Sequence, residues 1–413
     1  MRVAFYYSHH ESLGHTTRVA AILEGLVKHF GKDIDILIIH AGSKQKTFNL
    51  ERYGKVLDLP FAIKNAYSLD IDSVIKNMIN KKVFHSMIKR RIELIKNNIM
   101  EFKPDIFVTE FFPFGRHAWY IEIPPILNFI KKNAQAKTVC SVGYPEIENN
   151  TYDNIKRFYD FIIFHCTKID VETYKKTLES RDISHEKFTE ILDNFADKIF
   201  FTNYVIRKKK LSLRNEVIKK LGFSTNKKFI VFSRGGGTRK PDIIPSLFTA
   251  KRLIKDKDLQ LLISTGPATE IEKNNLYSSL AKKMKNIKLV NYLPDFENYL
   301  NAADLSINMS GYNTAVRLLW LKKQNICIPA LNAGIKEFFL EKEVSIEQLY
   351  RAKLMENMGI SKIIDPYELD GKILKTKMVE LLENPMKPNS KINKLKFNGI
   401  ENTVKIIEKI SSS

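Results

Sequence analysis

The chain places histidine, glycine and arginine together in one early loop. The stretch Tyr6–Leu23 (YYSHHESLGHTTRVAAIL) passes from a strand-like start through this loop into a helix-like pattern. Gly14 permits a close approach to a ligand. His15 stands at the start of the helix, where the helix dipole lowers its proton affinity and suits it to act as a neutral general base. The alternative is a polar loop in which the histidines only cap the helix and form hydrogen bonds.

Two glycine turns follow strand-like runs later in the chain. Ser233–Thr238 (SRGGGT) has three successive glycines, whose backbone N–H groups can cradle phosphate oxygens. Ser264–Pro267 (STGP) ends the next run. Neither loop matches the Walker A or GxGxxG pattern, so each can also be a simple surface turn.

A third loop concentrates more polar groups at the start of a helix. The run Leu305–Asn308 leads into MSGYNT (309–314), with a helix expected from about Ala315. Hydroxyls, an amide and free N–H groups meeting there suit a diphosphate, while ordinary capping by Asn313 or Thr314 is the alternative. A later helix begins with a Glu-Gln pair (347–348), whose groups can bond sugar hydroxyls or simply favour the helix start.

Alternating strand-like and helix-like runs must position these loops. This pattern predicts parallel sheets with right-handed crossovers, in which ligands bind beyond the carboxyl ends of the strands. A basic segment, Arg207–Lys228, divides the pattern into two series, so we predict two facing Rossmann-like domains. The predicted strands are Arg2–Tyr7, Asp35–His40, Asp105–Thr109, Thr138–Val142, Phe161–His165, Lys198–Thr202, Lys228–Ser233, Leu259–Ser264, Ile287–Val290, Leu305–Asn308 and Ile326–Pro329.

The charge balance favours anionic partners. Among 413 residues, 67 Lys and Arg face 46 Asp and Glu, giving a formal charge of +21. Nucleotides, nucleic acid or an acidic membrane surface would suit this charge, and general lysine enrichment is the plain alternative. A non-enzymatic nucleic-acid-binding protein is therefore one hypothesis. No RNP-type motif, helix-turn-helix signature or zinc finger supports it, so we expect no specific nucleic-acid partner.

Cysteine and histidine usage predicts a cytoplasmic protein without a metal site. The three cysteines are scattered and form no CxxC pair, which fits a reducing compartment. His9 and His10 are adjacent, and neighbouring side chains of an extended segment diverge, so we predict no metal there.

The chain shows neither a signal peptide nor an apolar run long enough to span a bilayer. The segment Val74–Phe102 has seven Lys or Arg against two Glu, with apolar residues at helical spacing. Such a helix can lie on an anionic membrane, which would make the protein peripheral. We favour the alternative, a helix packed on the sheet with a solvated basic face.

Taken in order, these pieces resemble the GT-B glycosyltransferases, most closely the MurG-like, family 28-like group. The resemblance rests on LGHTTR, SRGGGT, STGP, ADLSINMSGYNTAVRLLWL and EQLYRA, with PDIFVTEFFPFGRHAW (Pro104–Trp119) in addition, and runs to about residue 355. It implies an α/β, GT-B fold: an acceptor domain over 1–205, a nucleotide-sugar domain over 206–390, and a C-terminal helix over 391–413 packing back towards the first domain.

The resemblance also implies an activity and roles for residues. A hexosyltransferase would move a sugar from a nucleotide-sugar, preferably a UDP-sugar, to a hydroxyl group of an acceptor. The acceptor is unknown and would be a glycan, a lipid-linked molecule or a small molecule. The reaction would invert the anomeric carbon and need no metal cofactor. A cell-envelope glycan is the expected product class, and a nucleotide-sugar 2-epimerase or hydrolase is the alternative. The catalytic base would be His15; the acceptor side would include His10, Arg18, Glu110 and Arg116; the donor side would include Gly14, Arg234, Gly235, Gly236, Gly237, Thr238, Gly266, Ser310, Gly311, Tyr312, Asn313, Thr314, Glu347 and Gln348.

Overall fold

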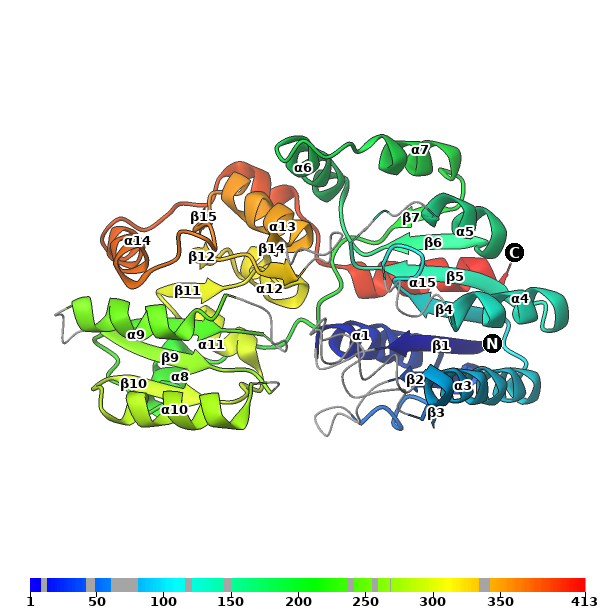
Figure 1. Ribbon diagram of the computed structural model, residues 1–413, viewed down its shortest axis with the longest axis horizontal. Coiled ribbons are helices and arrows are strands. Elements are labelled where there is room, and N and C mark those ends of the chain that lie inside the picture. The colour runs from blue at the N-terminus through cyan, green and yellow to red at the C-terminus, as the bar shows by residue number, and fades with distance from the viewer. Residues whose placement is uncertain are drawn as a thin grey trace.

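The computed structural model divides the chain into two lobes, each built on one parallel sheet (Figure 1). The two main sheets confirm the predicted α/β fold with two Rossmann-like units. The structure describes residues 1–8, 13–41, 49–60, 81–115, 121–144, 147, 150–235, 241–254, 259–267, 269–333 and 342–412.

The first sheet has seven parallel strands in the order β3-β2-β1-β4-β5-β6-β7. Its central strands, β1, β4 and β5, are buried along most of their length, as expected for a sheet covered by helices on both faces. The strands are β1 (Arg2–Ser8), β2 (Asp35–Ala41), β3 (Lys55–Asp58), β4 (Ile106–Glu110), β5 (Lys137–Val142), β6 (Phe161–Phe164) and β7 (Ile199–Phe201).

The second sheet repeats this order over six parallel strands, β10-β9-β8-β11-β12-β15. A short antiparallel pair, β13 with β14, lies apart from it. The strands are β8 (Lys228–Ser233), β9 (Leu259–Ser264), β10 (Ile287–Val290), β11 (Leu305–Asn308), β12 (Asn325–Cys327), β13 (Leu331–Ala333), β14 (Lys342–Val344) and β15 (Ser361–Ile363).

Helices connect the strands and cover both sheets (Figure 1). The first lobe has α1 (Leu13–Phe30), α3 (Lys81–Phe102), α4 (Ile123–Asn133), α5 (Thr151–Phe158), α6 (Lys168–Glu179) and α7 (Glu186–Asn194), with a 3₁₀ turn η1 (Gly31–Asp33). The second has α8 (Arg214–Lys220), α9 (Ile244–Leu253), α10 (Ile271–Lys282), α11 (Phe296–Ala302), α12 (Tyr312–Leu321), α13 (Ile346–Asn357) and α14 (Gly371–Glu383). The turn η3 (Ser390–Lys394) and α15 (Gly399–Ser411) follow.

The strand order reverses once in each sheet, between β1 and β4 and between β8 and β11. Loops on the two sides of such a reversal diverge and leave room for a ligand beyond the carboxyl ends of the strands. The loops after β1 and β4, and those after β8 and β11, therefore define where a site is expected. The two edges face each other across the junction of the lobes (Figure 1).

The last helix, α15, belongs to the core of the first lobe, where it lies in the picture (Figure 1). Val404, Ile407 and Ile410 recur at helical spacing and are buried among apolar residues of α1, β1 and β2. A Cβ on Gly25 of α1 would lie 2.4 Å from a methyl carbon of Ile400, so glycine lets the two helices approach closely.

Two segments that connect the lobes are joined to each other. The Tyr204 N–H donates to the Lys396 carbonyl (3.3 Å), and the Gly399 N–H donates to the Tyr204 carbonyl (3.0 Å). The Asn203 amide donates to the Asn398 side-chain oxygen at 2.9 Å. The chain thus crosses between the lobes twice, and the two crossing segments lie side by side.

Helix α3 packs on the first sheet through the part that the structure describes. Ile88, Ile95 and Ile99 are buried on one face, while Lys89 and Arg90 are exposed on the other. This arrangement is the packed alternative that the sequence favours over a helix lying on a membrane, and residues 61–80 lie outside the described ranges. Among the described helices, none combines the length and the apolar character needed to cross a membrane.

Candidate active site

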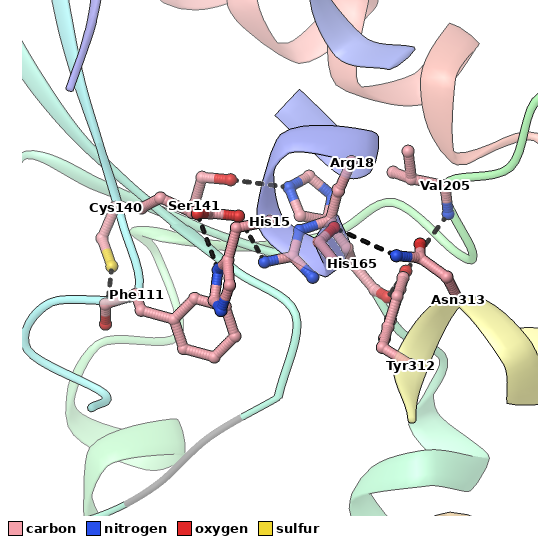
Figure 2. Close-up of polar contacts among 11 residues, drawn as sticks. His15, Arg18, Phe111, Cys140, Ser141, His165, Val205, Tyr312 and Asn313 are labelled. Carbon is pink, nitrogen blue, oxygen red and sulfur yellow. Dashed lines mark hydrogen bonds and ion pairs between the residues drawn. The ribbon is translucent and has the colours of Figure 1, made fainter. Parts of the chain in front are cut away.

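His15 and Glu110 meet where the order of the first sheet reverses. His15 lies in the first turn of α1 and Glu110 ends β4. The His15 Nδ1–H donates to Glu110 Oε2 at 2.8 Å (Figure 2). Because the carboxylate only accepts, this bond places the proton on Nδ1 and makes Nε2 the basic nitrogen of the neutral ring. A histidine oriented in this way can take a proton from a hydroxyl.

Arg18 binds the other oxygen of the same carboxylate. Its Nη2 donates to Glu110 Oε1 at 2.5 Å, and both side chains are nearly inaccessible to solvent. The guanidinium carbon lies 5.0 Å from the ring centres of both Phe111 and Tyr312, one from each lobe (Figure 2). Arg18, predicted on the acceptor side, is thus a buried partner of Glu110 placed between two aromatic rings.

Two neighbours of this pair had no signal in the sequence. Phe111 follows Glu110 with a φ of +71°, a left-handed conformation that is unfavourable for a bulky residue and that directs its ring onto His15 at 4.9 Å. A Cβ on Gly143 would lie 2.2 Å from Arg18 Nη1. Glycine at this position is what lets the guanidinium occupy its place.

A buried histidine lies next to this cluster. The His165 Nδ1–H bonds the Thr202 hydroxyl and its Nε2 accepts from the Ser141 hydroxyl, both at 2.9 Å. Thr202 in turn donates to a backbone carbonyl, which sets these directions. Burial and the positive charge of Arg18 lower the pKa of His165 to about 3, so the ring is neutral. Through its bonds to Ser141 and Thr202, the His165 side chain connects β5 to the segment that leads into the second lobe.

On the second lobe, the loop after β11 leads into α12. Ser310 has a φ of +48° and is fully buried: its N–H donates to the Asn308 side chain (2.7 Å), and its hydroxyl donates to the Gln348 carbonyl (2.7 Å). Gly311 precedes the helix, and a Cβ there would meet nothing within 4 Å. The free N–H groups of the first turn of α12, starting at Tyr312, carry the positive end of the helix dipole.

The predicted Glu-Gln pair lies in the first turn of α13 beside this loop. Glu347 forms an ion pair with Arg351, whose Nε donates to the Ser310 carbonyl at 2.8 Å. Burial opposes the charge of Arg351, but Glu347 raises its pKa above the ordinary value, so the residue stays charged. The Gln348 side-chain oxygen accepts from the Ala330 N–H at 2.7 Å. This pair therefore holds the Ser310 loop in place, and only Glu347 is partly exposed.

The loops after β8 and β9 pack closely against each other. Gly235 and Gly266 have φ values of +77° and +89°, and a Cβ on Gly266 would lie 2.4 Å from the Gly235 carbonyl oxygen. Arg234 is mostly buried, and its N–H donates to the Ser264 carbonyl at 3.1 Å. These backbones reach the same carboxyl edge as the start of α12.

The two edges contact each other directly. The Asn313 side-chain amide donates to the Gly14 carbonyl at 3.0 Å, which joins the start of α12 to the start of α1. The Tyr312 hydroxyl donates to the His165 carbonyl at 2.8 Å (Figure 2). The structure therefore brings together the predicted residues Gly14, His15, Arg18, Glu110, Ser310, Gly311, Tyr312 and Asn313.

The remaining predicted residues are placed less centrally or are not described. Thr314 lies in the first turn of α12, half-buried, while the Arg234, Gly235 and Gly266 loops form a separate part of the second lobe's edge. His10, Arg116, Gly236, Gly237 and Thr238 lie outside the described residues. In the described ranges, no group of three or more His, Cys, Asp or Glu side chains is placed to hold a metal ion.

Solved structures with the same fold carry the names of different enzymes. MurG from Acinetobacter baumannii is 11% identical and superposes with a TM-score of 0.56 over 99% of both chains. A putative UDP-N-acetylglucosamine 2-epimerase from Listeria monocytogenes is 13% identical, with a TM-score of 0.56 over 93% of this chain and 88% of that one. These likenesses show the fold, so the chain is a GT-B protein.

Sequence relatives define the family more narrowly. The model of the glycosyltransferase family 28 C-terminal domain matches residues 230–407. A UDP-N-acetylglucosamine–N-acetylmuramyl-(pentapeptide) pyrophosphoryl-undecaprenol N-acetylglucosamine transferase of Clostridioides difficile (strain 630) is 26% identical over 327 residues, 76% of this chain and 69% of that protein. Other relatives are matched over 52% and 61% of their lengths. The chain is therefore a glycosyltransferase with a family 28 C-terminal domain, and over most of its length it is similar to the MurG-like enzymes.

Proposed function

We propose that the protein transfers a sugar from a UDP-sugar to a hydroxyl acceptor, with inversion at the anomeric carbon. The proposal rests on one observation: a candidate base in the first lobe lies directly against a candidate phosphate-binding helix start in the second lobe. The oriented His15–Glu110 pair lies on one sheet edge, the start of α12 lies on the other, and the Asn313–Gly14 hydrogen bond joins them at 3.0 Å.

The second lobe supplies the donor half of the proposal. The first turn of α12, with Gly311 before it and open space at its Cα, suits a diphosphate held by backbone N–H groups. The helix end carries the equivalent of roughly half a positive charge, which stabilises the departing nucleoside diphosphate. In this proposal no metal ion is needed for the reaction. The names of the relatives, which include UDP-N-acetylglucosamine, support UDP as the nucleotide.

The first lobe supplies the base. The acceptor oxygen attacks the anomeric carbon while its proton passes to His15 Nε2, and the bond between the sugar and the diphosphate breaks. Glu110, held at 2.8 Å from Nδ1, stabilises the imidazolium that forms. One displacement of this kind inverts the anomeric configuration. The acceptor class supported by the relatives' names is a lipid-linked glycan precursor.

A first experiment tests the donor site. Melting temperatures would be recorded with UDP, GDP and dTDP in the presence of EDTA, and we expect UDP to raise the melting temperature. Asn313→Ala should lose this increase, whereas Asn226→Ala, an exposed amide in a distant turn, should keep it. No increase with any of the three nucleotides would contradict the proposed donor site.

A second experiment tests the reaction. The protein is incubated with UDP-N-acetylglucosamine, with and without a pyrophosphoryl-polyprenol glycan acceptor, and products are followed by NMR. Acceptor-dependent UDP release with an inverted product supports the proposal, and His15→Ala should reduce the rate about 10²- to 10⁴-fold with unchanged folding. Release of free sugar without acceptor would instead identify a hydrolase, and appearance of the 2-epimer would identify an epimerase.

A further inference from the structure

Arg18 is a buried cation that contacts both lobes at once. Its side chain is 3% exposed, and its Nη2 bonds Glu110 Oε1 at 2.5 Å. Phe111 covers one side of the guanidinium and Tyr312, from α12, covers another, each with its ring centre 5.0 Å from Cζ. The flat guanidinium suits such stacking, and a lysine ammonium would not fill the same space.

Tyr312 is itself fixed to the first lobe. Its hydroxyl donates to the His165 carbonyl at 2.8 Å and accepts from the Val205 N–H at 3.3 Å (Figure 2). Tyr312 as a whole is 8% exposed. The position of α12 therefore determines whether an aromatic ring lies against Arg18, and so whether Arg18 is confined beside Glu110.

We propose that Arg18 is a positioning residue that aims Glu110 at His15 and limits the proton affinity of His15, and that it does so only while Tyr312 of α12 is seated against it. This inference deepens the proposed function, since it rests on His15 acting as the base. The start of α12 is where the diphosphate is proposed to bind, so donor binding and the state of the base would be connected through two side chains.

The charges around His15 support this role. Glu110 would by itself stabilise the imidazolium, while Arg18 shares the carboxylate and adds an opposing positive charge. Among the described groups near this carboxylate, burial lowers the pKa of His165 to about 3 and raises the pKa of Cys140, Tyr7 and Tyr312, so these four groups are neutral at pH 7. Arg18 carries its positive charge directly against Glu110, at 2.5 Å from Oε1.

The test is the titration of His15 itself, which needs neither donor nor acceptor. The full chain is labelled at histidine ¹³Cε1, and the His15 signal is assigned by its loss in His15→Gln. In Arg18→Met we expect the titration midpoint of His15 to move upward by on the order of one pH unit. An unchanged midpoint in a folded Arg18→Met protein would overturn the proposal.

Two substitutions of Tyr312 test the connection to α12. Tyr312→Leu removes the ring from Arg18 and should move the His15 midpoint part of the way towards that of Arg18→Met. Tyr312→Phe loses the two hydroxyl bonds but keeps the ring, so it serves as the matched control, with a midpoint closer to that of the wild type than the midpoint of Tyr312→Leu. Equal midpoints in Tyr312→Leu and Tyr312→Phe would refute the connection. If Arg18→Met does not fold, this pair still tests it.

The inference and the proposed function fail separately. If the wild type transfers no sugar but the midpoints move as expected, the proposed function is wrong and the coupling of Arg18 to His15 stands. If the wild type transfers sugar and the midpoints do not move, the role of Arg18 is wrong. In an active enzyme, the acidic limb of the kcat/KM profile should move with the NMR midpoint, which a purely structural role of Arg18 would not produce.

Discussion

Gly143 allows the candidate site to be perturbed by one methyl group. In Gly143→Ala the new Cβ would lie 2.2 Å from Arg18 Nη1, 2.7 Å from Cζ and 3.1 Å from Nη2. Gly143 is not among the residues with positive φ, so alanine adds no backbone strain of its own. The three heavy atoms nearest to the new methyl group all belong to Arg18, so the substitution acts mainly through this side chain.

The size of the effect follows from the confinement of Arg18. A flexible, exposed arginine would move away at little cost, but this one is ion-paired with Glu110 and stacked between Phe111 and Tyr312. Overpacking costs about 1–3 kcal/mol, and breaking a hydrogen bond to a charged group costs about 1.5–3 kcal/mol. Arg18 must either stay and be overpacked or move and lose this bond, so we expect the free energy of unfolding to fall by about 1–3 kcal/mol.

Urea unfolding at neutral pH measures this loss, and a double-mutant cycle assigns it. In an Arg18→Ala background the methyl group has room, so Gly143→Ala should cost little, with a coupling energy of about 1–3 kcal/mol. Gly311→Ala is the matched control, because a Cβ there meets nothing within 4 Å. An equal loss with and without the Arg18 side chain would refute the reasoning, as would an unchanged urea midpoint.

Two further predictions concern buried groups outside the reaction. The pKa of His165 is lowered to about 3, so between pH 6.5 and 3 the unfolded chain binds a proton that the folded chain does not. The free energy of unfolding should therefore fall by about 1.4 kcal/mol per pH unit as the pH decreases. In urea titrations from pH 7 to 5, His165→Gln should remove this share of the pH dependence. Arg91 donates through Nε to the fully buried Glu122 at 2.8 Å. Arg91→Met leaves this carboxylate without its cation and should lower the free energy of unfolding by about 3–5 kcal/mol, measured by thermal or urea unfolding, and the double variant Arg91→Met/Glu122→Leu should recover most of the loss. Equal stabilities of the single and double variants would contradict this prediction.

The sequence was sufficient to predict the alternating fold and the loops that carry polar groups. β8 through β11 have the predicted bounds because each is an apolar run between polar turns. β3, β13, β14 and β15 were missed, because each is only three or four residues long and none contains more than two apolar residues in succession. Short edge strands are defined by their neighbours in the sheet.

The candidate site was predictable in its residue types and not in its bonds. His15, Arg18 and Glu110 follow strands that end at one edge, so their proximity could be expected. Gly143 carries no local signal, because what it accommodates is a side chain 125 positions earlier in the chain. Arg351 looks like a solvent-facing residue of a polar helix, yet it is buried against Tyr144 of the other lobe. Such contacts depend on how the two lobes pack against each other. The sequence pattern of a single helix does not show this packing.

The contribution of α15 to the first lobe has a consequence for biosynthesis. A ribosome releases the chain from the amino end, so residues of α1 and β1 emerge long before Val404, Ile407 and Ile410, which complete the apolar cluster around them. Until then Gly25 and its neighbours on α1 lack the helix that covers them. The first lobe is thus translated first, but its core is completed last. The second lobe can fold while the first lobe still lacks its final helix.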